Sequence, residues 1–373
     1  MNTLQIDLSN QKQVRDFLSL PSRIYRDIPQ WVPPLEGDER TRMNPKRYPY
    51  FKHSKAAFFL AYRDGIPVGR LTVLDNRPYN DHNHEQTAFF YHFECEPDLN
   101  SASSLFEVGF DWTRQRGLTK ILGSKGFTAL DGMGILVQGH DLRPALGSPY
   151  NPPYYADLIE SAGFVRTNDI VSGYLGPDIH FPERIHELAD RIRERRGLRI
   201  KRFRSRNELR SALGNLKSLY NGALEGTPGA IPISDEEIRA LANQIIWFAD
   251  PNLIKIVMKD QQPVGFLLAY PDISAALQRT KGRLFPFGWI TVLKEIRKTD
   301  CININGAGMI KEYRGSGGTA ILYSEMFKSV IENPHYQHAE VVQIGLENEK
   351  MQREMENFGV NFYKVHRMYE KVI

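Results

Sequence analysis

The chain has 373 residues, of which 41% are hydrophobic and 25% charged, and its formal net charge is +4. This composition is typical of a globular protein long enough for two domains, and so modest a charge does not indicate a nucleic-acid partner. We expect a cytoplasmic protein without a bound metal, since no apolar run approaches the ~20 residues of a membrane span, the N-terminus lacks a signal pattern, and Cys95 and Cys301 have neither metal nor disulfide spacing.

The first half predicts a strand and helical material followed by a strand hairpin over 57–76, whose turn precedes Pro67-Val68-Gly69. A further strand over 89–96 places His92, Glu94 and Glu96 on one face, since alternate residues of a strand share a face. A carboxylate beside a histidine is a candidate amine base, so we take His92 and Glu94 as candidate catalytic residues. The alternative is a polar sheet surface facing solvent.

The first half continues with a helix over 102–117, a buried strand over 120–126 and a short helix over 154–164. Two prolines give this last helix an extended lead-in that is crowded with aromatic residues. We interpret this lead-in either as a substrate wall or as an aromatic staple of the helix. Its candidate substrate residues are Tyr150, Asn151, Tyr154 and Tyr155.

The same order of elements recurs in the second half. A hairpin over 253–272 again carries a Pro-Val-Gly, at Pro263, about half the chain beyond the first. A strand, a helix, a buried strand and a short helix follow it. A repeat of this length indicates duplicated domains rather than a solenoid. We place the domains at 1–180 and 198–373, with a charged helical connector at 181–197.

One insertion has no counterpart in the first half. Residues 279–298 carry six basic side chains around an aromatic and aliphatic middle that includes Phe285, Phe287 and Trp289. This pattern suits the surface of an anionic membrane, on its inner face in the cell. It suits equally a helix packed between the domains with its charged ends in solvent.

A glycine-rich loop joins the next strand to its helix at 314–319, with glycines at 315, 317 and 318. Glycines allow close approach of a ligand, the unpaired N–H groups of a helix start attract anions, and Arg314 adds a positive charge. The loop therefore predicts a pyrophosphate site, against the alternative of an ordinary tight turn. The first half has acidic residues, Glu96 and Asp98, at the equivalent place.

This loop and its lead-in, Met309 to Thr319, resemble the acyl-CoA motif of the GCN5-related N-acetyltransferase (GNAT) family, although Thr319 replaces the usual Gly or Ala. The resemblance implies a mixed α/β fold with two tandem GNAT-like domains, each a mostly antiparallel central sheet with flanking helices. It implies an acyl-CoA or acetyl-CoA co-substrate, or an acyl carrier protein as donor. It further implies a cofactor site made of the backbone N–H groups of Met309 and Ile310, the loop Arg314, Gly315, Ser316, Gly317, Gly318 and Thr319, and Asn348.

The family often places a tyrosine acid in the last helix, where this chain has Met355. Tyr363, His366 and Tyr369 follow on the last strand and any of them could substitute, and we take Tyr363 as the candidate. Asn348 is equally interpreted as a helix cap. Segments 25–35, 65–70 and 151–155 resemble the YghO-like branch and, more distantly, proteins assigned as bacterial ceramide synthases. We therefore expect an N-acyltransferase for a small-molecule or lipid amine. A catalytically silent fold that binds a CoA thioester or a protein partner is the alternative.

Overall fold

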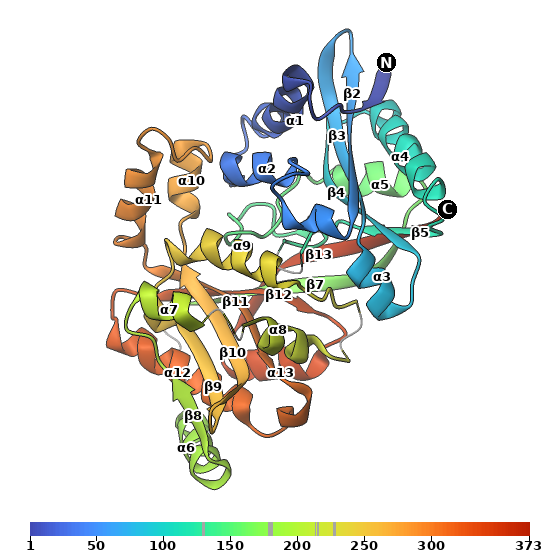
Figure 1. Cartoon of the computed structure of the whole chain (residues 1–373). Coiled ribbons are helices and arrows are strands. Elements are labelled where there is room, and N and C mark those ends of the chain that lie inside the picture. The colour runs from blue at the N-terminus through green and yellow to red at the C-terminus, as the bar shows by residue number, and fades with distance from the viewer. Residues whose placement is uncertain (129–130, 178–181, 213, 215, 227–228) are drawn as a thin grey trace.

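The computed structural model describes residues 1–128, 131–177, 182–212, 214, 216–226 and 229–373. Two successive sets of strands and helices form one twisted sheet with helices on both faces (Figure 1). The mixed α/β class and the tandem arrangement expected from the sequence are confirmed.

The first set runs from the N-terminus to the connector. Its elements are β1 (Asn2–Gln5), α1 (Gln11–Ile24), α2 (Glu36–Arg42), η1 (Pro49–Lys52), β2 (Lys55–Arg63), β3 (Ile66–Asp75), α3 (Arg77–Asn83), β4 (Thr87–Cys95), α4 (Leu99–Arg114), β5 (Lys120–Gly123), β6 (Ile135–Gln138), α5 (Tyr155–Ser161) and β7 (Val165–Leu175).

The second set follows the connector helix α6 (Glu183–Arg196). Its elements are β8 (Leu198–Lys201), α7 (Arg206–Ala212), α8 (Leu216–Leu224), α9 (Asp235–Ile246), η3 (Pro251–Leu253), β9 (Ile254–Lys259), β10 (Gln262–Pro271), α10 (Ser274–Thr280), α11 (Gly288–Ile296), β11 (Cys301–Met309), η4 (Lys311–Tyr313), α12 (Gly318–Glu332), β12 (His338–Gly345), α13 (Glu349–Asn357) and β13 (Asn361–Val372).

The two predicted hairpins are β2–β3 and β9–β10, both antiparallel. Their turns contain residues with positive φ, Asp64 and Gly65 in the first and Asp260 in the second. Asp and Gly tolerate this left-handed backbone, so the local sequence fixes both turns. Each hairpin is followed by a strand, a long helix and a parallel strand, with β4 pairing β5 and β11 pairing β12.

The two sets exchange their last strands. The sheet order is β1-β2-β3-β4-β5-β13-β7-β12-β11-β10-β9-β8. The C-terminal strand β13 lies between β5 and β7 of the first set, and β7 pairs with β12 of the second. Figure 1 shows β13 and β7 side by side at the centre of the molecule. Each half therefore depends on a strand from the other to complete its hydrogen bonding.

Apolar faces of the helices cover the sheet in the way their periodicity predicts. In the first half, Phe106 of α4 is buried with Leu71 and Val73 of β3, while Phe17 of α1 packs with Phe58 on the opposite face. In the second half, α12 buries one face in a separate core against β9, β10 and β11. The central parallel pairs β4/β5 and β11/β12 are thereby covered on both sides.

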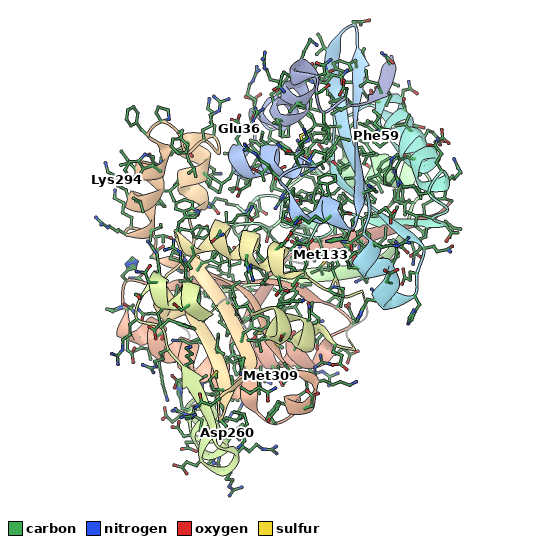
Figure 2. All side chains as sticks on the ribbon, viewed as in Figure 1. Glu36, Phe59, Met133, Asp260, Lys294 and Met309 are labelled. Carbon is green, nitrogen blue, oxygen red and sulfur yellow. The ribbon has the colours of Figure 1, made fainter. Side chains whose placement is uncertain are left out.

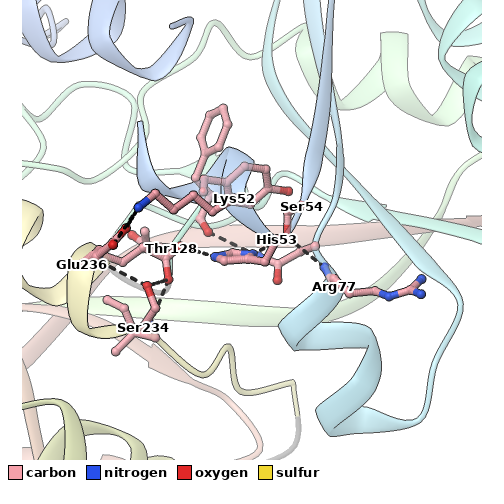
Figure 3. A network of polar contacts seen from close by, with 12 residues as sticks. Lys52, His53, Ser54, Arg77, Thr128, Ser234 and Glu236 are labelled. Carbon is pink, nitrogen blue, oxygen red and sulfur yellow. Dashed lines mark hydrogen bonds and ion pairs between the residues drawn. The ribbon is translucent and has the colours of Figure 1, made fainter. Parts of the chain in front are cut away.

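Polar contacts fix helix α9 of the second half against the first (Figure 3). The Nε2 atom of His53 lies 3.2 Å from Oε1 of Glu237, and Nζ of Lys52 lies 2.5 Å from Oε2 of Glu236. Glu237 also forms a capping box with Ser234. The first turn of α9 is therefore held both by its own cap and by the contact with His53. These contacts determine where α9 stands above the sheet. Across the described residues, no helix combines the length and the apolar character that crossing a membrane requires.

Candidate functional site

The glycine loop leaves the N-terminus of α12 open. Gly317 adopts a left-handed conformation (φ 84°) and no side chain caps the helix. The first N–H groups of a 15-residue helix therefore point out of its positive end, which suits an anion. The Arg314 guanidinium donates to the carbonyl oxygens of Met309 (3.3 Å) and Ala223 (3.0 Å), so its positive charge is held beside the loop.

Packing explains two of the loop's glycines independently of any ligand. A Cβ at Gly317 would lie 2.2 Å from Cδ1 of Ile192 on α6, and a Cβ at Gly318 would lie 2.3 Å from Cε of Met309. At either position a larger residue would require the end of the neighbouring Ile192 or Met309 side chain to shift. In contrast, a Cβ at Gly315 would meet nothing within 4 Å. The glycine pattern thus serves both tight packing and an open helix end.

The strands on either side of this loop separate halfway along. β11 and β12 pair from Cys301–His338 to Ile304–Val341 and then part, since β12 turns to β7. The register of β11 shifts at Asn305, which is the bulged residue. The resemblance placed free N–H groups at Met309 and Ile310; the N–H of Ile310 instead donates to the carbonyl of Val264 at 2.9 Å. The irregular backbone of β11 therefore lies closer to its N-terminal end than predicted, at Asn305.

In the first half, an aspartate caps the helix that corresponds to α12. The Asp98 carboxylate caps α4, accepting hydrogen bonds from the N–H groups of Asn100 (3.3 Å) and Ser101 (3.1 Å). Arg63 pairs with Asp98, and Arg23 lies 2.5 Å from Glu96. Two N–H groups of this helix end are therefore already bonded, and the carboxylate that holds them would repel a phosphate.

A cavity of about 300 Å³ lies between the two halves. It lies where β4 and β5 separate, and the second half closes it with residues of α9, β10, α10 and β11. Its apolar lining includes Trp31, Val32, Pro33, Pro34, Leu35, Leu241, Ile245, Phe248, Leu268, Ile273 and Leu277. Its polar lining includes Asp38, Glu39, Arg42, Arg70, His92, Glu94, Asp131, Tyr150, Asn151, Gln244, Tyr270 and Asn305. The bulged Asn305 of β11 and the His92 of β4 thus face one cavity.

His92 is held by a buried polar cluster at the floor of the cavity. Its φ of 48° marks the β-bulge of β4. Its Nε2 atom lies 2.9 Å from Oε2 of Glu39, and its Nδ1 atom lies 3.0 Å from the hydroxyl of Thr72. Arg42 joins Glu39 (3.1 Å) to Asp131 (2.5 Å). The Nδ1 atom of the candidate base therefore has a hydrogen-bond partner, whereas its buried Nε2 atom lies close to Glu39 without forming a hydrogen bond.

The charges around Glu39 outweigh its burial. Burial alone would raise the pKa of this carboxyl group, but His92 and Arg42 lower the pKa to about 2. Glu39 is therefore ionised at neutral pH and holds a negative charge beside the His92 ring. Glu94 also lines the cavity and forms a 2.6 Å ion pair with the buried Arg70. The sequence predicted His92 and Glu94 as neighbours on one strand. In the structure His92 lies against Glu39, and Glu94 pairs with Arg70.

The predicted substrate wall divides into two pairs. Tyr150 and Asn151 line the cavity, although the Asn151 side chain is occupied with the backbone of Leu136 and Pro152. The Tyr154 hydroxyl donates to the carbonyl of Cys95 (2.9 Å), and the Tyr155 hydroxyl accepts from the N–H of Cys95 (3.0 Å). The second pair therefore fixes the end of β4 from behind the cavity.

Other residues predicted for the site lie outside this cavity. The Tyr363 hydroxyl donates to Glu340 at 2.5 Å, and burial together with that carboxylate raises the pKa of Tyr363. Asn348 caps α13 through the N–H of Met351 (3.2 Å), as its alternative interpretation proposed. Met355, at the place of the family's tyrosine, is buried in the core. Tyr363 therefore does not join His92 in one arrangement.

Sequence reasoning missed Glu39, Arg42, Asp131 and Thr72. The first two stand in α2, whose sequence EGDERTR reads as a solvated charged helix. Only the contact of α2 with β4 and with the segment before β6 makes these side chains part of a buried cluster. No local pattern would have identified them.

Comparisons with known proteins cover the chain almost completely. YghO of Escherichia coli K12 is 25% identical over 371 residues, which span 98% of this chain and 94% of that protein. A bacterial ceramide synthase of Caulobacter vibrioides is 26% identical over 377 residues, spanning 99% and 97%. No family model matches the chain.

Solved structures share the fold at low identity. A tandem GNAT protein from the clavulanic acid biosynthesis pathway has a TM-score of 0.55 at 11% identity, covering 100% of this chain and 98% of that one. A probable N-acyltransferase of Enterococcus faecalis has a TM-score of 0.51 at 9% identity, covering 100% and 72%. The tandem GNAT fold therefore extends over the whole chain, and the resemblance drawn from its motifs is confirmed.

Proposed function

We propose that this tandem GNAT chain is an N-acyltransferase that moves an acyl group from a CoA thioester to a primary amine bound between its halves. The observation that carries the proposal is the shared cavity. Asn305, at the bulge where β11 leaves β12, and His92, with its buried carboxylate partner, line the same space. A thioester that extends from the open end of α12 along β11 would reach that space.

The second half supplies the donor site in this proposal. The pyrophosphate would lie at the N–H groups that open α12, beside Arg314. Gly306 and Gly308 leave β11 without side chains on the way to Asn305, and a Cβ at Gly306 would meet a single atom within 4 Å, at 3.9 Å. An acyl carrier protein would present the same phosphopantetheine arm, so it remains the alternative donor.

The charges of the cavity favour a cationic acceptor. Four carboxylates (Asp38, Glu39, Glu94 and Asp131) face two guanidinium groups (Arg42 and Arg70). The carboxylates of the lining therefore outnumber its guanidinium groups, and this excess of negative charge attracts an ammonium group. The apolar residues of the same lining suit the hydrocarbon part of the acceptor.

The reaction requires the ammonium to lose one proton. His92 is the candidate base, because the ordinary pKa of histidine lies near neutrality and Glu39 stabilises the imidazolium that forms. Its Nδ1 atom is bonded to the Thr72 hydroxyl, and its Nε2 atom lies 2.9 Å from Glu39 without a hydrogen bond, so the contact at one of these nitrogens must be exchanged as the amine binds. The free amine then attacks the thioester carbonyl carbon and the C–S bond breaks. The nitrogen loses its second proton on becoming an amide, the departing CoA thiolate takes that proton, and the first proton leaves from His92 to solvent.

The test is CoA release from acyl-CoA thioesters with a panel of primary amines from short and soluble to long-chain, with the amide identified by mass spectrometry. We expect His92→Gln to slow turnover by about 10²-fold or more, the usual contribution of a general base, while CoA binding persists. Tyr363→Phe is the matched control, since it lies outside the cavity, and should keep turnover within a few-fold. CoA binding without turnover of any amine would favour the silent fold instead.

A further inference from the structure

The α10–α11 hairpin exposes an unusual group of aromatic side chains. Phe285 and Phe287, between the helices, are 85% and 71% exposed, and Trp289 at the start of α11 is 44% exposed. Leu293, one turn further along α11, is also exposed. Large aromatic residues gathered at one protruding tip are rare on surfaces that face only water.

Positive charge runs along this hairpin, from Lys281 next to the aromatic residues to Lys294, Arg297 and Lys298 at the far end of α11. Among the described residues, no ion pair involves Lys281, Lys294, Arg297 or Lys298, and all four side chains are exposed. Arg279 pairs with Glu295, and Arg283 lies 2.8 Å from Glu36. Figure 2 shows Lys294 projecting from the outer side of the hairpin, away from the rest of the chain. The hairpin therefore combines exposed rings at its tip with unneutralised cations along the outer helix.

The hairpin is held firmly at its base, next to the cavity. The Gln278 amide donates to the carbonyl oxygens of Pro29 (2.7 Å) and Trp31 (3.0 Å), and the N–H of Glu36 donates to the carbonyl of Gly282 (3.0 Å). Leu277 of α10 lines the cavity together with Pro33, Pro34 and Leu35. The exposed rings thus belong to a fixed element, and its base forms the rim of the cavity.

We propose that this tip, Phe285 to Trp289 with its flanking cations, inserts into the surface of an anionic membrane. The rings would enter the interface while Lys281, Lys294, Arg297 and Lys298 meet the lipid headgroups. Charge complementarity and the fixed geometry favour a bilayer, because a lipid surface accepts exposed rings without any shape complementarity. Resting on the proposed function, this orientation places the apolar rim of the cavity nearest the bilayer, so the acceptor is a lipid amine taken from the membrane.

Flotation of the full chain with vesicles containing phosphatidylserine tests the docking directly. We expect flotation at low salt and its loss at ~1 M salt, where charges are screened beyond about 3 Å. Phe285→Ser with Phe287→Ser should weaken vesicle binding by about tenfold or more for each ring. The matched control replaces two exposed aliphatic residues elsewhere, Val165→Ser with Ile331→Ser, and should float like the wild type.

A charge variant provides a second, independent measurement. Lys294→Glu, Arg297→Glu and Lys298→Glu together should weaken binding by at least about 10²-fold, because each basic residue near an anionic leaflet contributes roughly fivefold. The control makes the same charge change on the connector helix, with Arg191→Glu, Arg195→Glu and Arg196→Glu, and should keep floating. Wild-type protein that stays with the buffer, or tip and control variants that float alike, would overturn the docking proposal.

Two further measurements separate the docking from the chemistry. Tip variants should slow acylation of a long-chain amine in vesicles while leaving acylation of a short soluble amine unchanged. Flotation without turnover of any amine would retain the membrane surface and reject the proposed function. Turnover of soluble amines by a wild type that does not float would support the proposed function and reject the membrane surface. Binding of an acidic protein instead of vesicles would assign the tip to a protein partner.

Discussion

CoA should raise the melting temperature of this protein, and Arg314 should carry much of that effect. The open end of α12, with Gly317 uncapped and Arg314 beside it, binds an anion only when the loop is folded. A ligand present at 100 times its dissociation constant stabilises the folded state by about 2.7 kcal/mol. Because β13 and β7 are exchanged between the halves, we expect the whole chain to unfold as one unit.

The size of the shift follows from the chain length. An unfolding entropy of about 2 cal/mol/K per residue gives about 0.8 kcal/mol/K for the whole chain, so the expected shift is about 3 °C. A charge-assisted hydrogen bond contributes ~1.5 to 3 kcal/mol. Arg314→Ala should therefore weaken CoA by about 10-fold to 10²-fold and reduce the shift, at the same CoA concentration, to less than about 2 °C.

The assay is a thermal melt of each protein with and without CoA, so that any change of Arg314→Ala in the absence of ligand cancels. Arg195→Ala, an exposed arginine of the connector helix, is the control and should keep the full shift. An unchanged melting temperature of the wild type at millimolar CoA would refute the site at α12. Equal shifts in wild type and Arg314→Ala would refute the role of Arg314.

Three further outcomes are expected. Glu39→Gln should destabilise the protein near pH 7 by about 3 kcal/mol, since the native pKa of Glu39, about 2, lies below its ordinary value of 4.5. This stabilisation is complete above pH ~4.5 and is lost as the pH falls toward 2. The free energies of unfolding of wild type and variant, measured with denaturant, should therefore converge in acid, and a constant difference between them would contradict the argument. Calorimetry should find one CoA site per chain, and Asp98→Asn should leave that number unchanged; two equal sites in the wild type would show that the capped end of α4 also binds CoA. Gly306→Leu should remove CoA protection while the protein without CoA melts within a few degrees of wild type, because a Cβ there meets only Phe266 at 3.9 Å; full protection in this variant would place the CoA arm elsewhere.

The sequence by itself determined the elements and their repetition. The Pro-Val-Gly hairpins at Pro67 and Pro263, the helix periodicities and the loop after Arg314 are local patterns, and local backbone preferences are enough to produce them. The basic and aromatic insertion at 279–298 was also evident, because composition alone distinguishes it. The fold class and the GNAT resemblance followed from these features.

The tertiary structure decided what those elements face. Nothing in the sequence of β13 indicates that it pairs with β5 and β7, since the partner of a strand depends on the packing of the whole sheet. The same holds for the site: His92 was recognised as a strand residue, but Glu39 and Arg42 became its neighbours only when α2 packed over the bulge of β4. Tyr363, plausible by its position in the chain, pairs with Glu340 instead. A buried charge is stable only beside its partner, and partners distant in the sequence meet only in the folded chain.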